Sequence, residues 1–267
     1  MRWCLIADAG GPLVTQLDLL GSGNAFLPSG RLHSLLLIDQ HIMIDCPPTA
    51  LASLRNAGIS PADIDMILIT HVHADHVFGF PNFILERKYI SDRNGEKQLT
   101  VAGSKIVRKR LELLCELAYP DSLNDVLSNI NWVDTPKSDE WTFERFEVKH
   151  DPKVEPHGWM MTHERGWSLL HSGDSGPCDE LWERAKQCKF AIVEMSVPDR
   201  VITEYHHTPS QISQLANECP DTVFLLTHTY IDCDYEILTT DTPELPPNVI
   251  LGHDGMKFSL NQNGDSV

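Results

Sequence analysis

An apolar run that ends in a cluster of polar side chains limits the folds open to this chain. Residues Ile64–Thr70 are almost continuously apolar and are bounded by polar residues, which is typical of a strand buried on both faces. His71, His73, Asp75 and His76 follow within the next six residues. Three imidazoles and one carboxylate at this spacing indicate metal ligands more strongly than a polar loop cap. We therefore expect a buried strand whose end carries a metal site.

Strand and helix patterns alternate along the rest of the chain. Apolar runs between turn signals predict strands at 14–20, 34–39, 42–45, 64–70, 98–102, 142–149, 158–161, 167–171, 190–195 and 222–227, and a final pair at 249–251 and 256–260. Helical patterns cover 49–57, 80–90, 104–118, 180–186 and 209–218, whereas 120–131 is ambiguous. Strands separated by helices indicate sheets covered by helices. With no internal repeat and no linker, we expect residues 1–267 to form a single domain.

The charge balance argues against a broad nucleic-acid surface. The formal net charge is -17, and affinity for phosphate backbones comes mostly from clustered Lys and Arg. The nearest basic run, Lys105–Arg110, lies in a predicted helix and is interpreted as a solvated helix face. Nucleic acid is therefore a disfavoured partner, although it is not excluded.

The cysteines and the apolar segments point to an ordinary cytoplasmic protein. Seven cysteines are scattered and never spaced as CxxC, so neither a disulfide framework nor a cysteine-ligated zinc is predicted. We expect most of them to be small buried residues in a reducing compartment. The first ten residues contain Asp8 and no long apolar stretch, and no segment is long enough to cross a bilayer. A cytoplasmic location without membrane attachment is expected.

Three later residues, each following a strand-like segment, complete a possible pair of metal sites. These residues are His150, Asp174 and His228. A lone histidine at a strand end is weak evidence, but a carboxylate such as Asp174 can bridge two cations. One metal would then be held by His71, His73 and His150. The other would be held by Asp75, His76 and His228. Imidazole and carboxylate ligands suit zinc, manganese or iron, and two such ions leave room for a bridging hydroxide.

This ordered ligand set resembles that of the metallo-β-lactamase superfamily. The resemblance spans most of the chain, and its further motifs are Leu20–Asn24, Ile44–Cys46, Ser172–Asp174, Leu226–His228 and Asp254–Met256. The ligands are very specific for the superfamily and moderately specific for its ribonuclease Z-like branch, which includes tRNA 3′-processing endonucleases and small-molecule phosphodiesterases. The resemblance implies an α/β (α+β) four-layer αββα sandwich, with two mixed sheets and helices on the outside. It also implies that Asp45 supports the ligand loops without binding metal.

The branch usually carries one further histidine before the last ligand, as a proton donor or phosphate contact. His206 and His207 are adjacent candidates, and His206 fits the spacing to the following helix better. Histidine is suited to protonating an alkoxide leaving group. The alternative, of about equal weight, is that Thr208 or Ser210 caps the helix and both histidines are exposed loop residues. The candidate catalytic residues are therefore Asp75, His206 and His207.

The leading hypothesis for function is a dinuclear-metal hydrolase. It would cleave a small or cyclic phosphodiester through a metal-bridging hydroxide. A tRNA 3′-processing endonuclease is the alternative, but no basic arm is evident between His76 and His150. A lactone or thioester hydrolase would use the same site, and a metal-binding protein without turnover is least favoured. A homodimer is left open.

Overall fold

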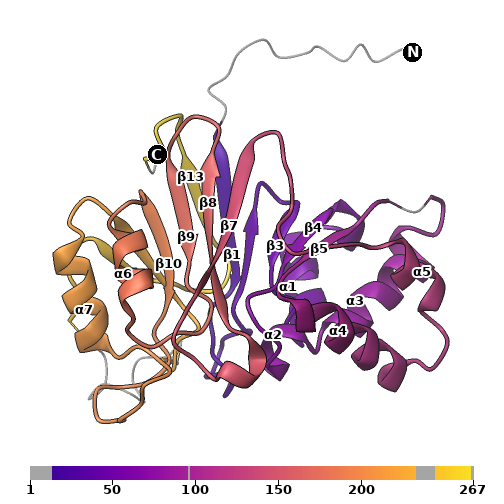
Figure 1. Ribbon diagram of the computed structural model, residues 1–267, viewed down its shortest axis with the longest axis horizontal. Coiled ribbons are helices and arrows are strands. Elements are labelled where there is room, and N and C mark those ends of the chain that lie inside the picture. Colours follow the sequence, from indigo (N-terminus) through magenta and orange to yellow (C-terminus); the bar gives the residue numbers. More distant parts are fainter. Residues whose placement is uncertain (1–13, 96, 233–243, 266–267) are drawn as a thin grey trace.

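The computed structural model describes residues 14–95, 97–232 and 244–265. Two mixed sheets form its centre (Figure 1). The first sheet has the order β13 (Met256–Leu260), β1 (Thr15–Gly21), β2 (Leu35–Ile38), β3 (Ile42–Ile44), β4 (Met66–Leu68), β5 (Thr100–Ala102) and β6 (Asn131–Val133). The second has the order β12 (Val249–Leu251), β11 (Val223–Thr227), β10 (Phe190–Glu194), β9 (Ser168–His171), β8 (His157–His163) and β7 (Trp141–Glu147).

Helices cover the outer face of each sheet (Figure 1). Those beside the first sheet are α1 (Ala50–Ala57), α2 (Ala74–Val77), α3 (Phe80–Glu86), α4 (Lys105–Ala118) and α5 (Asn124–Asn129). Those beside the second are α6 (Asp179–Ala185) and α7 (Pro209–Glu218). Short single turns occur at Pro61–Asp63 and Pro152–Val154, and a π-helical turn, Arg87–Ser91, continues α3. The predicted αββα sandwich is therefore confirmed.

Three hydrophobic clusters fill the spaces between these four layers. The first joins the first sheet to its helices through residues such as Leu54, Phe83 and Leu111. The second lies between the two sheets and includes Trp159, while the third packs Leu215 of α7 against the second sheet. Burial of apolar surface in all three spaces is the main force that holds the layers together.

The helix ends follow from local sequence. Helix α1 ends at Gly58, whose φ of 72° lies in the left-handed region that suits a glycine after a helix. Helix α7 begins with Pro209, and the backbone N–H of Thr208 donates to Gln211 Oε1 at 2.9 Å. Thr208 is therefore the N-cap residue of α7 and forms a capping box with Gln211, next to the two candidate histidines.

The segment before the histidine cluster departs from its predicted form. The predicted strand at 64–70 shortens to β4, because the next backbone groups bond elsewhere. The amide of Thr70 donates to Asp45 Oδ1 at 2.7 Å instead of joining the sheet. The strand ends two residues early, at Leu68, and the loop that follows is hydrogen-bonded to Asp45.

The predicted final strand pair is wrong as a pair. Strand β12 runs parallel to β11 in the second sheet, whereas β13 runs antiparallel to β1 in the first. The ambiguous stretch at 120–131 forms α5 and leads into β6, which lies parallel to β5. A three-residue edge strand carries too little pattern to be predicted from sequence.

The structure also bears on the cysteines and on membrane attachment. All five described cysteines are free: Cys46, Cys115, Cys178, Cys188 and Cys219. Cys4 and Cys233 lie outside the described residues. Across the described ranges, no helix combines the length and the apolar character that a membrane span requires.

Candidate active site

The candidate metal ligands gather at one edge of the fold, where the two sheets meet. His71 and His73 follow β4, and helix α2 then places Asp75 and His76 in its single turn. The remaining three follow β7, β9 and β11 of the second sheet: His150, Asp174 and His228. These three strands point the same way, because β7 and β9 both pair antiparallel with β8, and β9, β10 and β11 are mutually parallel. Their carboxyl ends therefore lie at one edge, the usual place for a site in such sheets.

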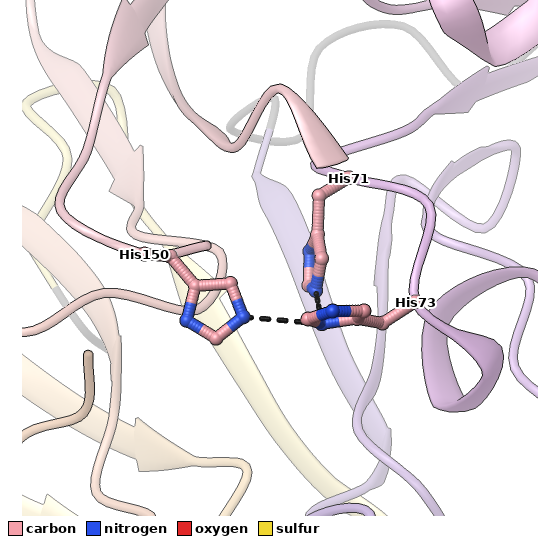
Figure 2. Close-up of side chains that lie close together, drawn as sticks. All are labelled: His71, His73 and His150. Carbon is pink, nitrogen blue, oxygen red and sulfur yellow. Dashed lines mark hydrogen bonds between the residues drawn. The ribbon is translucent and has the colours of Figure 1, made fainter. Parts of the chain in front are cut away.

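One group of candidate ligands consists of three histidines (Figure 2). His71 Nε2 lies 3.0 Å from His73 Nδ1, and His150 Nε2 lies 3.1 Å from the same atom. All three rings meet at their nitrogen atoms. Burial lowers the pKa of His71 well below its usual value and also lowers that of His150. Neutral imidazole is the form that binds a cation.

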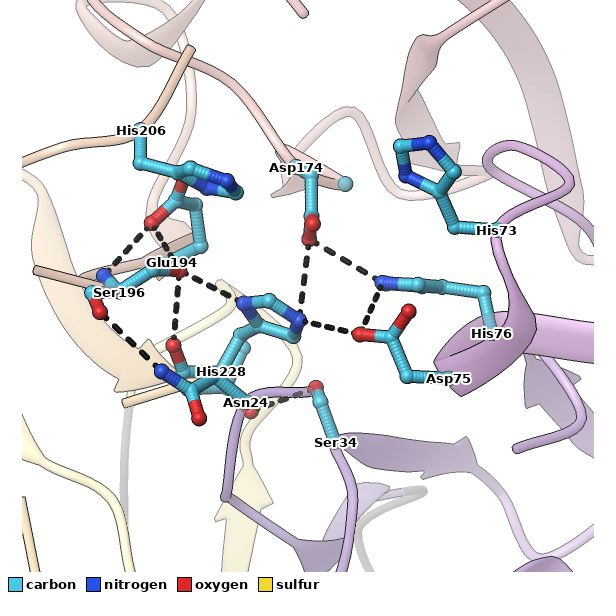
Figure 3. A network of polar contacts seen from close by, with 12 residues as sticks. Asn24, Ser34, His73, Asp75, His76, Asp174, Glu194, Ser196, His206 and His228 are labelled. Carbon is cyan, nitrogen blue, oxygen red and sulfur yellow. Dashed lines mark hydrogen bonds and ion pairs between the residues drawn. The ribbon is translucent and has the colours of Figure 1, made fainter. Parts of the chain in front are cut away.

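The second group combines carboxylates and imidazoles (Figure 3). His228 Nε2 lies 3.0 Å from Asp75 Oδ2, and His76 Nε2 lies 3.5 Å from that oxygen. Burial alone would raise the pKa of Asp75, but the charges of His76 and His228 lower it, so this side chain is a carboxylate. Asp174 completes the group.

Asp174 connects the two groups through its two oxygens. Oδ2 lies 3.9 Å from His71 Nε2 and 4.0 Å from His150 Nε2. Oδ1 lies 3.2 Å from His76 Nε2 and 3.5 Å from His228 Nε2. Each oxygen therefore faces a different group, which is the arrangement that a carboxylate bridging two cations requires.

Buried polar atoms that lack a hydrogen bond also indicate that the donor set fits divalent metals. Within the described part of the chain, His76 Nε2 and Asp174 Oδ1 are buried and make no hydrogen bond. Leaving such atoms unsatisfied costs about 1–3 kcal/mol each, so a native fold normally gives them a partner. A cation between them would supply that partner.

Polar side chains behind the candidate ligands hold their rings in place. Asp45 Oδ2 accepts from Thr70 Oγ1 at 2.8 Å and lies 2.8 Å from His76 Nδ1. Ser196 Oγ lies 2.7 Å from His228 Nδ1. Carboxylate and hydroxyl partners on the distal nitrogen fix the orientation and tautomer of a ligating histidine. This geometry fits the supporting role expected for Asp45.

Two of these residues have strained backbone. Asp45 has a φ of 64° and His228 a φ of 48°. Residues other than glycine seldom adopt this left-handed region, and the exceptions concentrate at functional sites. The fold thus holds both side chains in place at a cost in backbone energy.

His206 and Glu194 form a hydrogen-bonded pair beside the ligands (Figure 3). His206 Nδ1 lies 2.8 Å from Glu194 Oε1, and the His206 ring centroid is 5.0 Å from that of His150. Burial alone would lower the pKa of His206, but the hydrogen bond and charge of Glu194 raise it to about 9. Glu194 is fully buried and also accepts from the backbone N–H of Ser196 at 2.8 Å. Glu194 therefore orients the imidazole and favours its protonated form.

Sequence reasoning did not identify Glu194, although a signal was present. It is the only charged residue in the otherwise apolar run Phe190–Met195. A carboxylate at the end of a buried strand is seldom without a partner. The two histidine candidates also separate, because His206 faces the ligand groups whereas His207 is fully buried next to α7.

Comparison with known proteins places this chain in a family. The model of a family described as Anti-Pycsar protein Apyc1 matches residues 15–237. The anti-Pycsar protein Apyc1 of Paenibacillus sp. is 39% identical over 83 residues, which cover 30% of this chain and 34% of that protein. Ribonuclease Z of Pyrobaculum calidifontis is 23% identical over 251 residues, covering 80% of this chain and 86% of that protein.

Solved structures share the fold. The metallo-β-lactamase fold protein YhfI of Bacillus subtilis has a TM-score of 0.72 at 15% identity, with coverage of 92% of this chain and 100% of that one. A diphosphatase of the PhnP family reaches 0.69 at 18% identity, covering 94% and 98%. The short form of human tRNase Z also reaches 0.69, at 19% identity, covering 91% and 98%. The chain therefore has the metallo-β-lactamase fold.

Proposed function

The chain belongs to the family of the anti-Pycsar protein Apyc1, and we propose that it is a two-metal phosphodiesterase acting on a small or cyclic phosphodiester. The observation that carries this proposal is the pair of half-buried His206 and buried Glu194, beside two candidate ligand groups that both face Asp174. A paired site suits attack on a phosphodiester, and a protonated histidine suits departure of its alkoxide.

The proposal assigns the two metals to residues described above. One ion would be held by His71, His73, His150 and Asp174. The other would be held by Asp75, His76, Asp174 and His228. When bound, divalent ions of the zinc or manganese type would neutralise charge on the phosphate oxygens and lower the pKa of a water molecule.

The chain itself would handle the proton at the leaving oxygen. His206 would donate its Nε2 proton to that oxygen, because its Nδ1 is held by Glu194 at 2.8 Å. Glu194 would stabilise the imidazolium and fix its tautomer without taking part in bond breaking, as a carboxylate behind a catalytic histidine does. Hydrogen bonds from Ser196 N at 2.8 Å and Ser196 Oγ at 2.7 Å hold the Glu194 carboxylate in turn.

Charge and shape favour a small substrate over tRNA. The net charge of -17 gives long-range repulsion for a polyanion. The described part of the segment between His76 and His150 is occupied by helices and strands of the sandwich, without a basic arm. The names of the similar proteins do not decide the matter, because they include Ribonuclease Z and a diphosphatase.

A direct comparison of substrates tests the proposal. Purified protein loaded with zinc or manganese would be assayed on bis(p-nitrophenyl) phosphate, on 3′,5′-cyclic nucleotides, on a precursor tRNA with a 3′ trailer, and on a lactone and a thioester. We expect turnover of the phosphodiesters, and none by the Asp174→Ala variant, which controls for contaminating enzymes. Preference for the lactone or thioester would refute the proposal, and absence of all turnover would favour a non-enzymatic role.

Precursor tRNA cleavage is the second candidate function. The match to Ribonuclease Z of Pyrobaculum calidifontis, which covers 80% of this chain, favours it. Correct removal of a 3′ trailer at a kcat/KM above that for every cyclic nucleotide would establish this alternative. The repulsion argued above predicts instead weak cleavage that falls further at low ionic strength.

A further inference from the structure

A large pocket lies apart from the candidate active site, between helix α1 and the strands β1 and β13. Its volume of about 650 Å³ falls within the range of about 300–1,000 Å³ that is usual for small-molecule sites. Its wall comes from β1, from residues 30–32, from α1 and from residues 254–257. Within the described part of the chain, this wall includes none of the candidate metal ligands. The pocket is therefore a separate site.

The wall contains a buried cation that has only neutral partners. Arg31 is 3% exposed, and its Nη1 donates to Ser22 Oγ at 2.6 Å and to the carbonyl oxygen of Gly252 at 2.8 Å. Its Nε donates to the carbonyl oxygen of Ile231, and its Nη2 lies 3.4 Å from His253 Nδ1. Burial and the charge of Arg31 lower the pKa of His253, so this ring is neutral as well. A charge buried among neutral groups costs free energy that an opposite charge nearby would recover.

The carboxylate of the wall, Asp254, already has other partners. Its Oδ1 accepts from Ser22 N at 2.8 Å and from Ser22 Oγ at 2.6 Å, and its Oδ2 accepts from Leu32 N at 2.6 Å. Within the described residues, neither a hydrogen bond nor an ion pair joins it to Arg31. The charge of Arg31 is therefore not neutralised by direct contact.

Two further hydrogen-bond donors belong to the polar part of the wall. Lys257 Nζ lies 3.6 Å from Asp18 Oδ1, which is an ion pair but too long for a hydrogen bond, and the lysine side chain is 55% exposed. Ser53 of α1 is 1% exposed, and among the described residues its Oγ finds no hydrogen-bond partner. A native fold normally supplies a partner for such a buried hydroxyl. A bound acceptor would satisfy both donors.

The charges of the wall select the class of ligand. Arg31 and Lys257 carry positive charge against the single carboxylate of Asp254, although the whole chain has a net charge of -17. This local excess of positive charge favours an anion. Leu20 and Leu32 add apolar surface, which suits a small organic body attached to the charged group.

We propose that this pocket binds a small oxyanion, a carboxylate or a phosphate group. Its oxygens would accept protons from Lys257 Nζ and Ser53 Oγ, and its charge would lie beside Arg31. The guanidinium would act mainly through its charge, because most of its N–H groups already donate to the protein. This inference does not depend on the proposed phosphodiesterase function.

Arg31 also connects the pocket with the candidate active site. The carbonyl oxygen that accepts from its Nε belongs to Ile231, three residues after His228. An anion that stabilises Arg31 would therefore also stabilise the loop after β11, which begins with His228. Hydrogen exchange of the amides at 30–33, in α1 and at 229–232 would slow when the pocket is filled.

The test measures anion binding to the metal-loaded protein by titration calorimetry. Inorganic phosphate and butyrate serve as probes, and the tighter of the two identifies the source of the oxyanion. We expect Lys257→Gln and Ser53→Ala each to weaken its binding about tenfold, as loss of a hydrogen bond to a charged ligand predicts. Lys189→Gln is the matched control, because Lys189 Nζ lies 3.7 Å from Asp265 Oδ1 and the side chain is 50% exposed. It should bind like the wild type.

Anion binding at the metals is distinguished by the same variants. Equal affinity in Lys257→Gln, Ser53→Ala and Lys189→Gln would place the anion elsewhere and overturn the inference, as would absence of binding by the wild type. Slower hydrogen exchange confined to the loops of the candidate metal ligands would also overturn it. Ser53→Ala should not lower the unfolding temperature of the anion-free protein, because it removes an unpaired hydroxyl. Should it unfold, the exposed Lys257→Gln still decides the matter. None of these results affects the test of phosphodiester turnover.

Discussion

The contact between Asp45 and His76 offers the sharpest test of the metal site. Asp45 Oδ2 lies 2.8 Å from His76 Nδ1, and both side chains are 4% exposed. Asp45 Oδ1 accepts from Thr70 N at 2.7 Å, so one carboxylate contacts both the loop after β4 and the candidate ligand His76. The variant Asp45→Asn keeps the size of the side chain but replaces one acceptor oxygen with an NH₂ donor. That donor would face the N–H of His76 or the amide of Thr70.

The expected cost follows from this geometry. A buried donor without an acceptor costs about 1–3 kcal/mol, so the metal-free variant should unfold roughly 2–10 °C below the wild type. Loss of the partner behind a ligating histidine lowers metal affinity about 10–100-fold. The chelator concentration that strips the protein should fall by the same factor.

A second aspartate provides a matched control. Asp65 Oδ1 also lies 2.8 Å from a histidine, His41 Nδ1, but the two side chains are 60% and 36% exposed. Such surface pairs contribute about 0–1 kcal/mol. Asp65→Asn should therefore change neither metal retention nor the unfolding temperature by more than a small amount.

The measurements are metal content by mass spectrometry after dialysis against a chelator series, and thermal unfolding with and without added zinc. If Asp45→Asn retains metal as well as Asp65→Asn does at every chelator concentration, Asp45 does not support a metal ligand. If a His76→Ala variant also binds metal like the wild type, the assignment of His76 as a ligand is wrong as well.

Three further predictions concern the same fold. Asp174→Ala should remove both metals and all turnover, because its two oxygens face both ligand groups; wild-type metal content would contradict this. His206→Ala should lower kcat about 10²–10⁴-fold with metal retained, whereas the same result from His207→Ala would make that residue the proton donor. Burial raises the pKa of Cys115 and Cys188 to about 12, so iodoacetamide should label neither until the protein unfolds. Rapid labelling of either in peptide mass spectra would show an open site.

The candidate ligand residues were accessible to sequence reasoning because each follows a strand. The run that ends at Thr70 and the turn Ser172–Asp174 are local patterns, and the edge where strand ends meet is a property of the fold class. The structure brings these side chains together at the expected edge. The two oxygens of Asp174 face different groups of side chains. This depends on side-chain geometry, which the spacing of residues in the sequence does not predict.

Glu194 and the last two strands show what sequence cannot supply. Besides its neighbour Ser196, Glu194 has partners in two other segments, at Ser175 and His206, and sequence alone does not show that these segments lie together. Strands β12 and β13 are close in sequence and suggested a pair. At Gly252, between them, a Cβ atom would lie 2.2 Å from the carbonyl oxygen of Leu226, so the chain passes too near β11 for any larger residue. Three residues later, Gly255 N donates to the carbonyl oxygen of Leu19 at 2.8 Å, so the chain has already crossed to the first sheet.

The site at the meeting edge of the two sheets has a consequence for how the protein matures. His76 lies in the first third of the chain, whereas its proposed partner His228 directly follows β11, which pairs with β10. A nascent chain that ends before residue 222 would hold the three-histidine group but lack a ligand of the other. Complete metal loading would then follow the packing of the two sheets against each other. The bound metals would stabilise that packing afterwards.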